Sequence, residues 1–185
     1  MSFIDTEPRL LRPINYPAGA PGNGSIVLET AKGKVGVISV QMRTFMQPIL
    51  ENPFPALEAV VEAMRKETPI IFIDAHGETT SERIAIGRFM DGKVSAVVGT
   101  HTHVPTADET IRPGGTAYLS DVGMTGAYEG IIGFSKDRII EKFLSQTPRS
   151  FETAKKDIRL SGVVVGVDEE TGKATSIDRV QVRVD

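Results

Sequence analysis

Two short apolar runs joined by a helical segment constrain the fold of this chain more than any other feature. Ile70–Ile73 and Val94–Val98 each have the length of one strand, and neither alternates between apolar and polar residues. Strands of this kind are typical of parallel sheets that are covered on both faces. Between them, Thr79 and Glu82 form a capping box that would begin a helix ending near Met90. The pattern predicts a right-handed βαβ unit with neighbouring parallel strands.

Further strands are expected on both sides of this unit. Ser25–Thr30 and Lys34–Val40 are β-prone runs around a short turn and predict a hairpin. Thr116–Leu119 is another β-prone piece, and alternating valines at 163–167 and 180–184 predict a terminal hairpin. The chain is therefore expected to have an α/β fold.

Two amphipathic helices are expected outside the βαβ unit. The first begins at Asn52-Pro53, and Ser135 caps the second. Their predicted apolar faces are Leu57, Val60, Val61 and Met64 in the first helix, and Ile139, Ile140, Phe143 and Leu144 in the second. Residues at this spacing lie on one side of a helix and are expected to face the core.

Composition limits the class of protein. A chain of 185 residues is expected to form one domain, residues 1–185. The formal net charge of -3 argues against a stable complex with nucleic acid but leaves a small phosphorylated substrate open. With no cysteine, any metal must be bound by His, Asp, Glu, Asn or backbone oxygen. No signal peptide or stretch of membrane-spanning length is evident, so we expect a cytoplasmic protein without a membrane partner.

The three histidines of the chain follow the two strands of the βαβ unit. His76 comes after the first strand, and His101 and His103 come after the second. Ligands of open α/β sheets bind beyond the carboxyl ends of the strands, so we expect the three imidazoles to converge there. In an extended conformation, His101 and His103 would direct both rings to one side. The sequence therefore predicts a metal site made of these three histidines.

Three carboxylates near the histidines each have two interpretations. Asp74 either orients a histidine ring or lies at a strand end. Glu78 either does the same or belongs to the first turn of a helix. Asp121 either approaches the metal from its Gly-rich loop or organises the turn, and the turn is slightly favoured.

Four segments resemble the YmdB-type metallophosphoesterases, and together they cover nearly the whole chain. They are residues 7–17, 74–82, 99–108 and 114–126, and the most specific part is the run from Gly99 to Gly126. The resemblance implies a calcineurin-like sandwich of two β-sheets flanked by helices. It also implies a dinuclear centre of divalent Fe or Mn that cleaves nucleotide phosphodiesters, with 2′,3′-cyclic nucleotides as the expected substrate class.

Carried over by residue, the resemblance makes His76 and His101 ligands of one metal and His103 a ligand of the other. Thr102 and Thr125 lie in matching motifs and are further candidates for orienting the ligands or contacting substrate. The family's Gly-Asp, Glu-Asn and Asn-His motifs, including its presumed catalytic His, have no counterpart here. The chain is thus expected to be the C-terminal part of such a domain, N-terminally truncated, and to self-associate as a homo-oligomer through exposed sheet edges.

Three functional interpretations follow. The first is a metal-dependent phosphodiesterase. The second is a truncated, catalytically impaired module that binds metal or nucleotide, which the missing motifs favour. The third, a structural βαβ domain with incidental histidines, would require the match over Gly99 to Gly126 to be coincidental.

Overall fold

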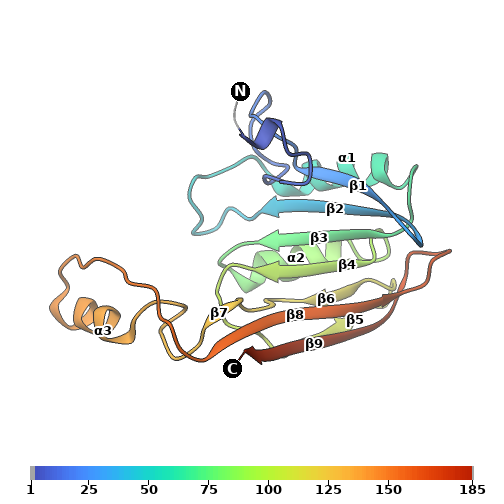
Figure 1. Ribbon diagram of the computed structural model, residues 1–185. Helices are drawn as coiled ribbons and strands as arrows, with labels where there is room; N and C mark the ends of the chain where they lie inside the picture. Colours follow the sequence, from blue (N-terminus) through green and yellow to red (C-terminus); the bar gives the residue numbers. More distant parts are fainter. Residues whose placement is uncertain (1–2, 185) are drawn as a thin grey trace.

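A six-stranded sheet in the order β1-β2-β3-β4-β6-β5 forms the centre of the computed structural model, which describes residues 3–184 (Figure 1). Its strands are β1 (Ser25–Thr30), β2 (Gly33–Gln41), β3 (Ile71–His76), β4 (Ala96–Thr100), β5 (Thr110–Ile111) and β6 (Ala117–Leu119). Strands β2, β3, β4 and β6 are parallel, whereas β1 and β5 are antiparallel to their neighbours. A short 3-10 helix, Phe3–Asp5, precedes the sheet. The expected hairpin of β1 and β2 is confirmed.

The predicted βαβ unit is confirmed. Helix α2 (Thr80–Phe89) connects β3 to β4, which pair in parallel from Phe72 opposite Ala96 to His76 opposite Thr100. The carboxyl ends of both strands therefore lie at the same edge of the sheet.

The predicted capping box is wrong in detail. Thr79 is the N-cap residue of α2, but its side chain makes no capping hydrogen bond and lies 3.3 Å from the Glu82 carboxylate. Glu82 instead accepts hydrogen bonds from the backbone N–H groups of Arg43 and Thr44, in the loop after β2. A tertiary contact thus replaces the local one and fixes that loop to α2.

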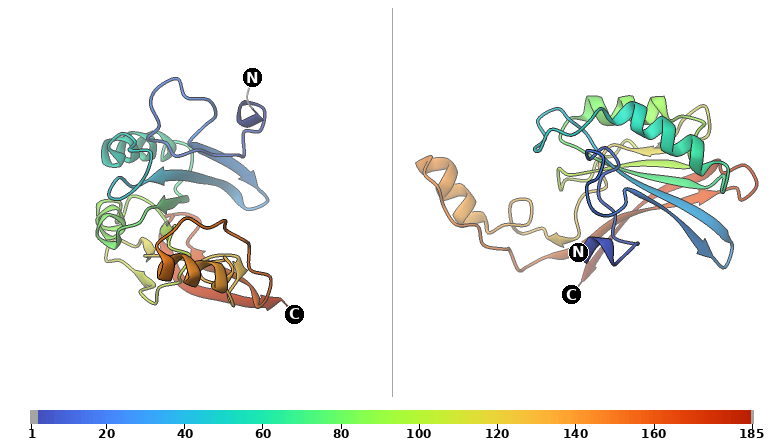
Figure 2. Two further views of the ribbon diagram at one scale, coloured as in Figure 1. Left: turned by 90° about the vertical axis from the view of Figure 1, so that its left-hand side faces the viewer. Right: turned by 90° about the horizontal axis from the view of Figure 1, so that it is seen from above.

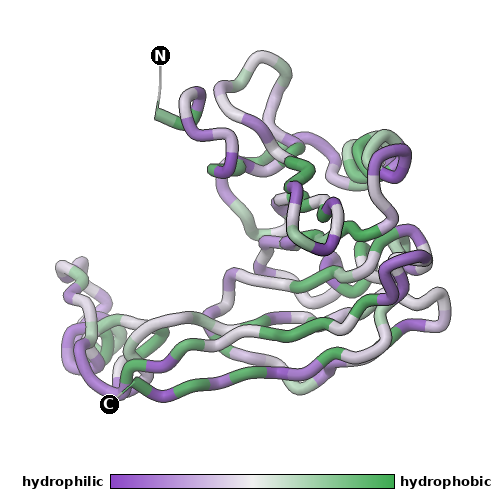
Figure 3. The backbone as a smooth tube through the Cα atoms, turned by 45° about the vertical axis from the view of Figure 1, so that its right-hand side comes forward, coloured by the Kyte–Doolittle hydropathy of each residue, from purple (hydrophilic) through white to green (hydrophobic). Residues whose placement is uncertain are grey.

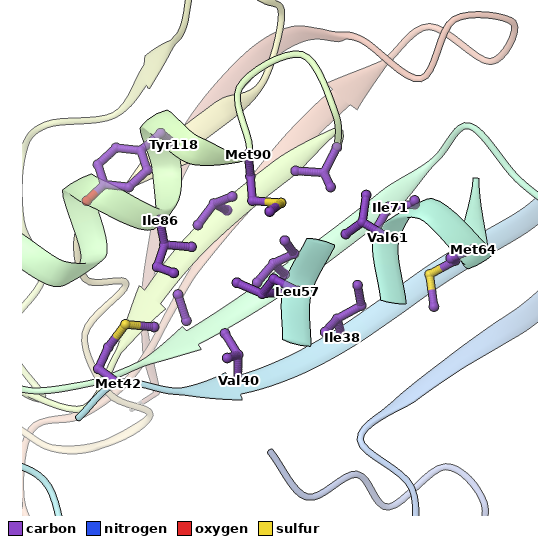
Figure 4. Packing of buried hydrophobic residues seen from close by; sticks show 14 of the residues in the cluster. Ile38, Val40, Met42, Leu57, Val61, Met64, Ile71, Ile86, Met90 and Tyr118 are labelled. Atoms are coloured by element: carbon purple, nitrogen blue, oxygen red, sulfur yellow. The ribbon is translucent and has the colours of Figure 1, made fainter. Parts of the chain in front are cut away.

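Helices α1 (Pro53–Met64) and α2 cover one face of the sheet (Figure 2). Asn52 caps α1 by accepting from the backbone N–H of Phe54, as its position predicts. The main core lies between these helices and the sheet, as Figure 4 shows for the packing of Leu57 and Val61 on β2 and β3. Its completely buried apolar side chains include Ile38, Val40, Leu57, Ile71, Ile73, Ile86 and Met90.

The opposite face of the sheet packs against a second sheet of three strands. These are β7 (Gly126–Ala127), β8 (Ile158–Val167) and β9 (Ala174–Val184), all antiparallel. The contact between the sheets is made by Phe72, Ala96, Ala117, Ala174, Val165 and Ile177. Two sheets with helices on one outer face agree with the expected metallophosphoesterase-type sandwich.

The terminal hairpin forms as expected, but its two valine runs face opposite sides. Val165 contacts the central sheet, whereas Val182 and Val184 are exposed on the other side of the hairpin. In Figure 3, apolar and polar residues alternate along the second half of β9. The register explains the difference, because Leu160 pairs with Val182 and therefore shares its outward direction.

Helix α3 (Lys136–Ser145) corrects another expectation. It lies on an arm that extends away from both sheets (Figure 1), and only Ile139 of its predicted apolar face is buried. Ile140 is 48% exposed, Phe143 is 70% exposed and Leu144 is 82% exposed. The predicted helix is confirmed, but the expectation that its apolar face packs on the core is wrong. Helical spacing shows which residues share a face and does not show whether another element covers that face. None of the helices in residues 3–184 combines the length and hydrophobicity needed to cross a bilayer.

Candidate metal centre

The candidate site lies at the carboxyl edge of the parallel strands. His76 is the last residue of β3, and Thr100, opposite it, is the last residue of β4. Asp121 follows β6, the next strand in the sheet. Parallel neighbours end at one edge, so residues far apart in sequence meet there.

The His76 ring is oriented by Thr100 and Asp74. The Thr100 hydroxyl donates to Asp74 Oδ1 at 2.8 Å and lies 2.9 Å from His76 Nδ1. Because a hydroxyl has one hydrogen, His76 Nδ1 must donate its own N–H to Thr100. The second ring nitrogen, Nε2, then has a free lone pair. Of the two interpretations of Asp74, the geometry agrees with the one in which it orients a histidine ring. Asp74 does so indirectly, through the Thr100 hydroxyl.

Burial affects the ionisation of both groups. Burial raises the pKa of Asp74, with the Thr100 hydrogen bond opposing the shift. Burial also lowers the pKa of His76, and the neighbouring His101 adds to that effect. A histidine with a lowered pKa stays neutral at neutral pH, which is the form that binds metal.

His101 directs one ring nitrogen at His76 and the other at a carboxylate. Its Nδ1 lies 3.1 Å from His76 Nε2, and the two rings meet edge to face with centroids 4.8 Å apart. Its Nε2 lies 3.1 Å from Glu78 Oε2. An ionised carboxylate only accepts, so Glu78 favours the tautomer with hydrogen on Nε2 and a free lone pair on Nδ1.

The partners of the two rings thus direct two lone pairs at each other. In neutral imidazoles this arrangement is repulsive unless a proton or a cation lies between the nitrogens. Since ligating imidazole nitrogens lie about 2.0–2.1 Å from a bound ion such as zinc, a separation of 3.1 Å allows His76 and His101 to share one ion. The donor set of His76 and His101 therefore fits a divalent metal.

His103 lies differently from the expectation. Its Nδ1 is 2.9 Å from the carbonyl oxygen of Ile132, at the base of the arm, which leaves Nε2 free. The expected extended conformation is wrong, because φ is 117° at His101 and 66° at His103. Among residues 3–184, no group of three or more His, Cys, Asp or Glu side chains is arranged to hold a metal ion. Ligation by all three histidines stays a prediction.

Asp121 is completely buried and forms an ion pair with Arg83. Its Oδ2 accepts from Arg83 Nη1 at 2.5 Å, and from the backbone N–H and hydroxyl of Thr102 at 3.0 and 2.8 Å. Its Oδ1 accepts from the backbone N–H of Gly123 at 2.9 Å. Asp121 therefore organises its own turn, as favoured, and also the segment that carries His101. Thr125, on the same loop, is exposed.

Arg83 is a residue of this site that was not predicted from the sequence. Its side chain is 1% exposed, and it shares the buried side of α2 with Ile86 and Gly87. The available signal was the position of Arg83 three residues before Ile86, which places both on the buried side of the helix. A buried guanidinium requires an acidic partner, so this position indicates an ion pair. Thr100 was likewise missed as the link between Asp74 and His76.

The fold and the relatives, which are named as phosphodiesterase and phosphatase, place the protein in the class of metallophosphoesterase-type enzymes. The chain belongs to the family described as YmdB-like protein, which it matches over residues 1–180.

Three relatives illustrate the likeness. The chain is 47% identical over 183 residues to a Bacillus subtilis (strain 168) protein named 2′,3′-cyclic-nucleotide 2′-phosphodiesterase, covering 99% of this chain and 69% of that protein. A crystal structure of a Mycoplasma pneumoniae protein described as a novel phosphatase has a TM-score of 0.88 at 32% identity, covering 98% of this chain and 66% of that one. A hypothetical protein from Thermus thermophilus gives a TM-score of 0.86 at 38% identity, covering 94% of this chain and 67% of that one. The chain thus spans about two thirds of the length of these relatives.

Proposed function

We propose that this chain carries part of the metal centre of a phosphodiesterase that hydrolyses nucleotide phosphodiesters, with 2′,3′-cyclic nucleotides as the substrate class. The observation that carries the proposal is the 3.1 Å distance between His76 Nε2 and His101 Nδ1, together with the contacts of the other two ring nitrogens to Thr100 and Glu78. The substrate class is supported by the name of the Bacillus subtilis relative.

The residues at the strand ends have distinct proposed roles. His76 and His101 bind a divalent ion, which we propose to be Fe or Mn as in the expected dinuclear centre. When bound, such an ion supplies positive charge for phosphoryl oxygens and activates water as a nucleophile. Thr100 and Asp74 hold His76 in the ligating tautomer, and Glu78 does so for His101. His103 Nε2 is proposed as a ligand of the second ion.

The alternative function is a module that binds metal or nucleotide without turnover. One observation favours it for the chain by itself: residues 3–184 contain no three-ligand cluster, so a two-histidine site would hold a metal weakly. General acid–base assistance contributes about 100- to 10,000-fold to typical enzymes, and no acid for the leaving group is assigned in this site. Exposed apolar side chains such as Phe143 and Leu144 support the further proposal of a homo-oligomer.

Metal analysis combined with a phosphodiesterase assay tests both functions. The 185-residue chain would be incubated with Mn²⁺ and 2′,3′-cyclic AMP beside a His101→Ala, His103→Ala double variant. Metal binding and hydrolysis that both disappear in the variant are expected for the enzyme. Metal binding without hydrolysis supports the module, and absence of metal from the unmodified chain contradicts both.

A further inference from the structure

The hydrogen bonds of the Arg83–Asp121 ion pair go to the loops that flank the metal site. Arg83 Nη2 donates to the carbonyl oxygen of Glu78, two residues after His76, at 3.3 Å. Arg83 Nη1 donates to the carbonyl oxygen of Thr100 at 3.3 Å, in addition to Asp121. The pair therefore connects the loop after β3 with the loop after β4.

The same pair holds His101 from both sides. The residue before it, Thr100, is held through its carbonyl oxygen by Arg83, and the residue after it, Thr102, is held through its N–H and hydroxyl by Asp121. Between these attachments, His101 has φ of 117°, a backbone conformation that side-chain-bearing residues rarely adopt. Such a conformation persists when the surrounding contacts over-determine it.

We propose that Arg83 and Asp121 are positioning residues that set the distance between His76 Nε2 and His101 Nδ1, and thereby the affinity of the site for a divalent cation. The inference rests on the proposed function, because it assumes that these two nitrogens bind an ion.

A purely stabilising role does not account for the choice of residues. A buried ion pair of 1% and 0% exposure contributes no more to stability than well-packed apolar side chains do in many proteins. What an apolar pair cannot do is hold backbone carbonyl and N–H groups of two loops in one place. The absence of a side chain at Gly99 also leaves room for the Arg83 side chain, since a Cβ at Gly99 would lie 2.9 Å from Arg83 Cδ.

Cobalt titration separates positioning from stability. The full 185-residue chain would be titrated with Co²⁺, whose visible absorption reports both affinity and coordination geometry. We compare the unmodified chain with Asp121→Asn and with the double variant Arg83→Met, Asp121→Leu, which replaces the pair by apolar side chains. Arg112→Met is the control, because the Arg112 guanidinium stacks on the Tyr118 ring instead of binding the histidine loops. Circular dichroism confirms that each variant is folded at the titration temperature.

We expect Co²⁺ affinity to fall by about 10- to 100-fold in both pair variants, as for other groups that orient metal ligands, with an altered absorption spectrum. The control should bind as the unmodified chain does. A folded double variant with unchanged affinity and spectrum would overturn the inference while leaving the proposed function intact. An unmodified chain that binds no Co²⁺ would instead contradict the proposed function.

If neither pair variant folds, Thr102→Val decides the question. It removes the hydroxyl bond to Asp121, together with the weaker 3.3 Å bonds of the same hydroxyl to the backbone of Val104, and leaves the ion pair in place. A loss of Co²⁺ affinity with an unchanged unfolding midpoint supports positioning, and unchanged affinity overturns it.

Discussion

His76 Nε2 lies 3.1 Å from His101 Nδ1, although the two residues are 25 positions apart in the sequence. The contact exists because β3 and β4 end together at one edge of the sheet, with His76 opposite Thr100. The other nitrogen of each ring has a neighbour of its own, Thr100 for His76 and Glu78 for His101, so we propose that the two facing nitrogens bind the cation.

Metal addition should stabilise the chain through these two rings. Mn²⁺ at a hundredfold excess over its Kd would add about 2.7 kcal/mol to the free energy of unfolding, if the unfolded chain does not bind it. His76→Ala should abolish this increase, whereas His103→Ala should retain most of it, because the His103 ring is oriented by the Ile132 carbonyl oxygen and is not part of the His76–His101 pair that binds the first ion. Thermal unfolding with Mn²⁺ and with EDTA measures the effect. Equal stabilisation in the unmodified chain and His76→Ala would contradict the assignment.

The Thr100 hydroxyl should determine the tautomer of His76. Thr100→Val keeps the side-chain volume nearly constant but removes the hydroxyl, which accepts from His76 Nδ1 and donates to Asp74. We expect metal affinity to fall by about 10- to 100-fold. Thr100→Ser keeps the hydroxyl and serves as the control. Nitrogen NMR of the His76 ring in the metal-free chain should show hydrogen on Nδ1 in the control, and the same tautomer in Thr100→Val would refute the role.

Gly99 should be required for the close approach of β4 and the segment after β6. A Cβ at this position would lie 1.7 Å from the carbonyl oxygen of Ser120, so the strands would have to separate. Gly99→Ala is expected to lower the free energy of unfolding by about 1–3 kcal/mol or more, the usual cost of overpacking. Gly162→Ala is the matched control in β8, because its nearest neighbour, Leu160 Cδ2, would be 3.9 Å away. Urea unfolding of both variants makes the comparison, and similar midpoints would show that the strands can adjust.

The exposed side of α3 should contribute little to folding stability. Leu144→Gln is expected to change the free energy of unfolding by less than about 0.5 kcal/mol, because Leu144 is 82% exposed. Ile139→Ala, at the 6% exposed position, should unfold the helix locally and increase hydrogen exchange across residues 136–145. A large destabilisation by Leu144→Gln at low protein concentration would mean that the arm packs in a way the structure does not show.

Asp157 should make stability depend on acid pH. Hydrogen bonds from Arg159 lower the pKa of the Asp157 carboxyl. A pKa that is lower in the folded state favours folding above the unfolded value, near pH ~4, and the benefit disappears as pH falls through the folded value. Asp157→Asn keeps a residue that tolerates the observed φ of 55°. Its melting temperature should be below that of the unmodified chain at about pH 7, and the two should converge at low pH; a constant difference would contradict the assignment.

Local patterns predicted most of the elements correctly. The βαβ unit, both hairpins and the helix after Asn52 follow from apolar periodicity and turn residues, which act over a few positions. The position of His76 and of His101 at strand ends also followed, since parallel strands end at one edge.

Contacts between distant segments decided the rest. Glu82 binds the loop after β2 instead of completing a capping box, and Arg83 pairs with an aspartate 38 positions away. The outward direction of Val182 depends on its register with Leu160, and the exposure of Leu144 depends on the arm's distance from the sheets.

The sequence by itself therefore determined which strands and helices form and which edge of the sheet carries the histidines, because those properties arise from short-range backbone and burial preferences. Only the tertiary structure decided which ring nitrogens face each other. That choice depends on hydrogen-bond partners, Thr100 for His76 and Glu78 for His101, and on the buried pair that holds their loops. Hydrogen bonds are directional and act over about 3 Å, so they become defined only when the packed chain brings the groups together.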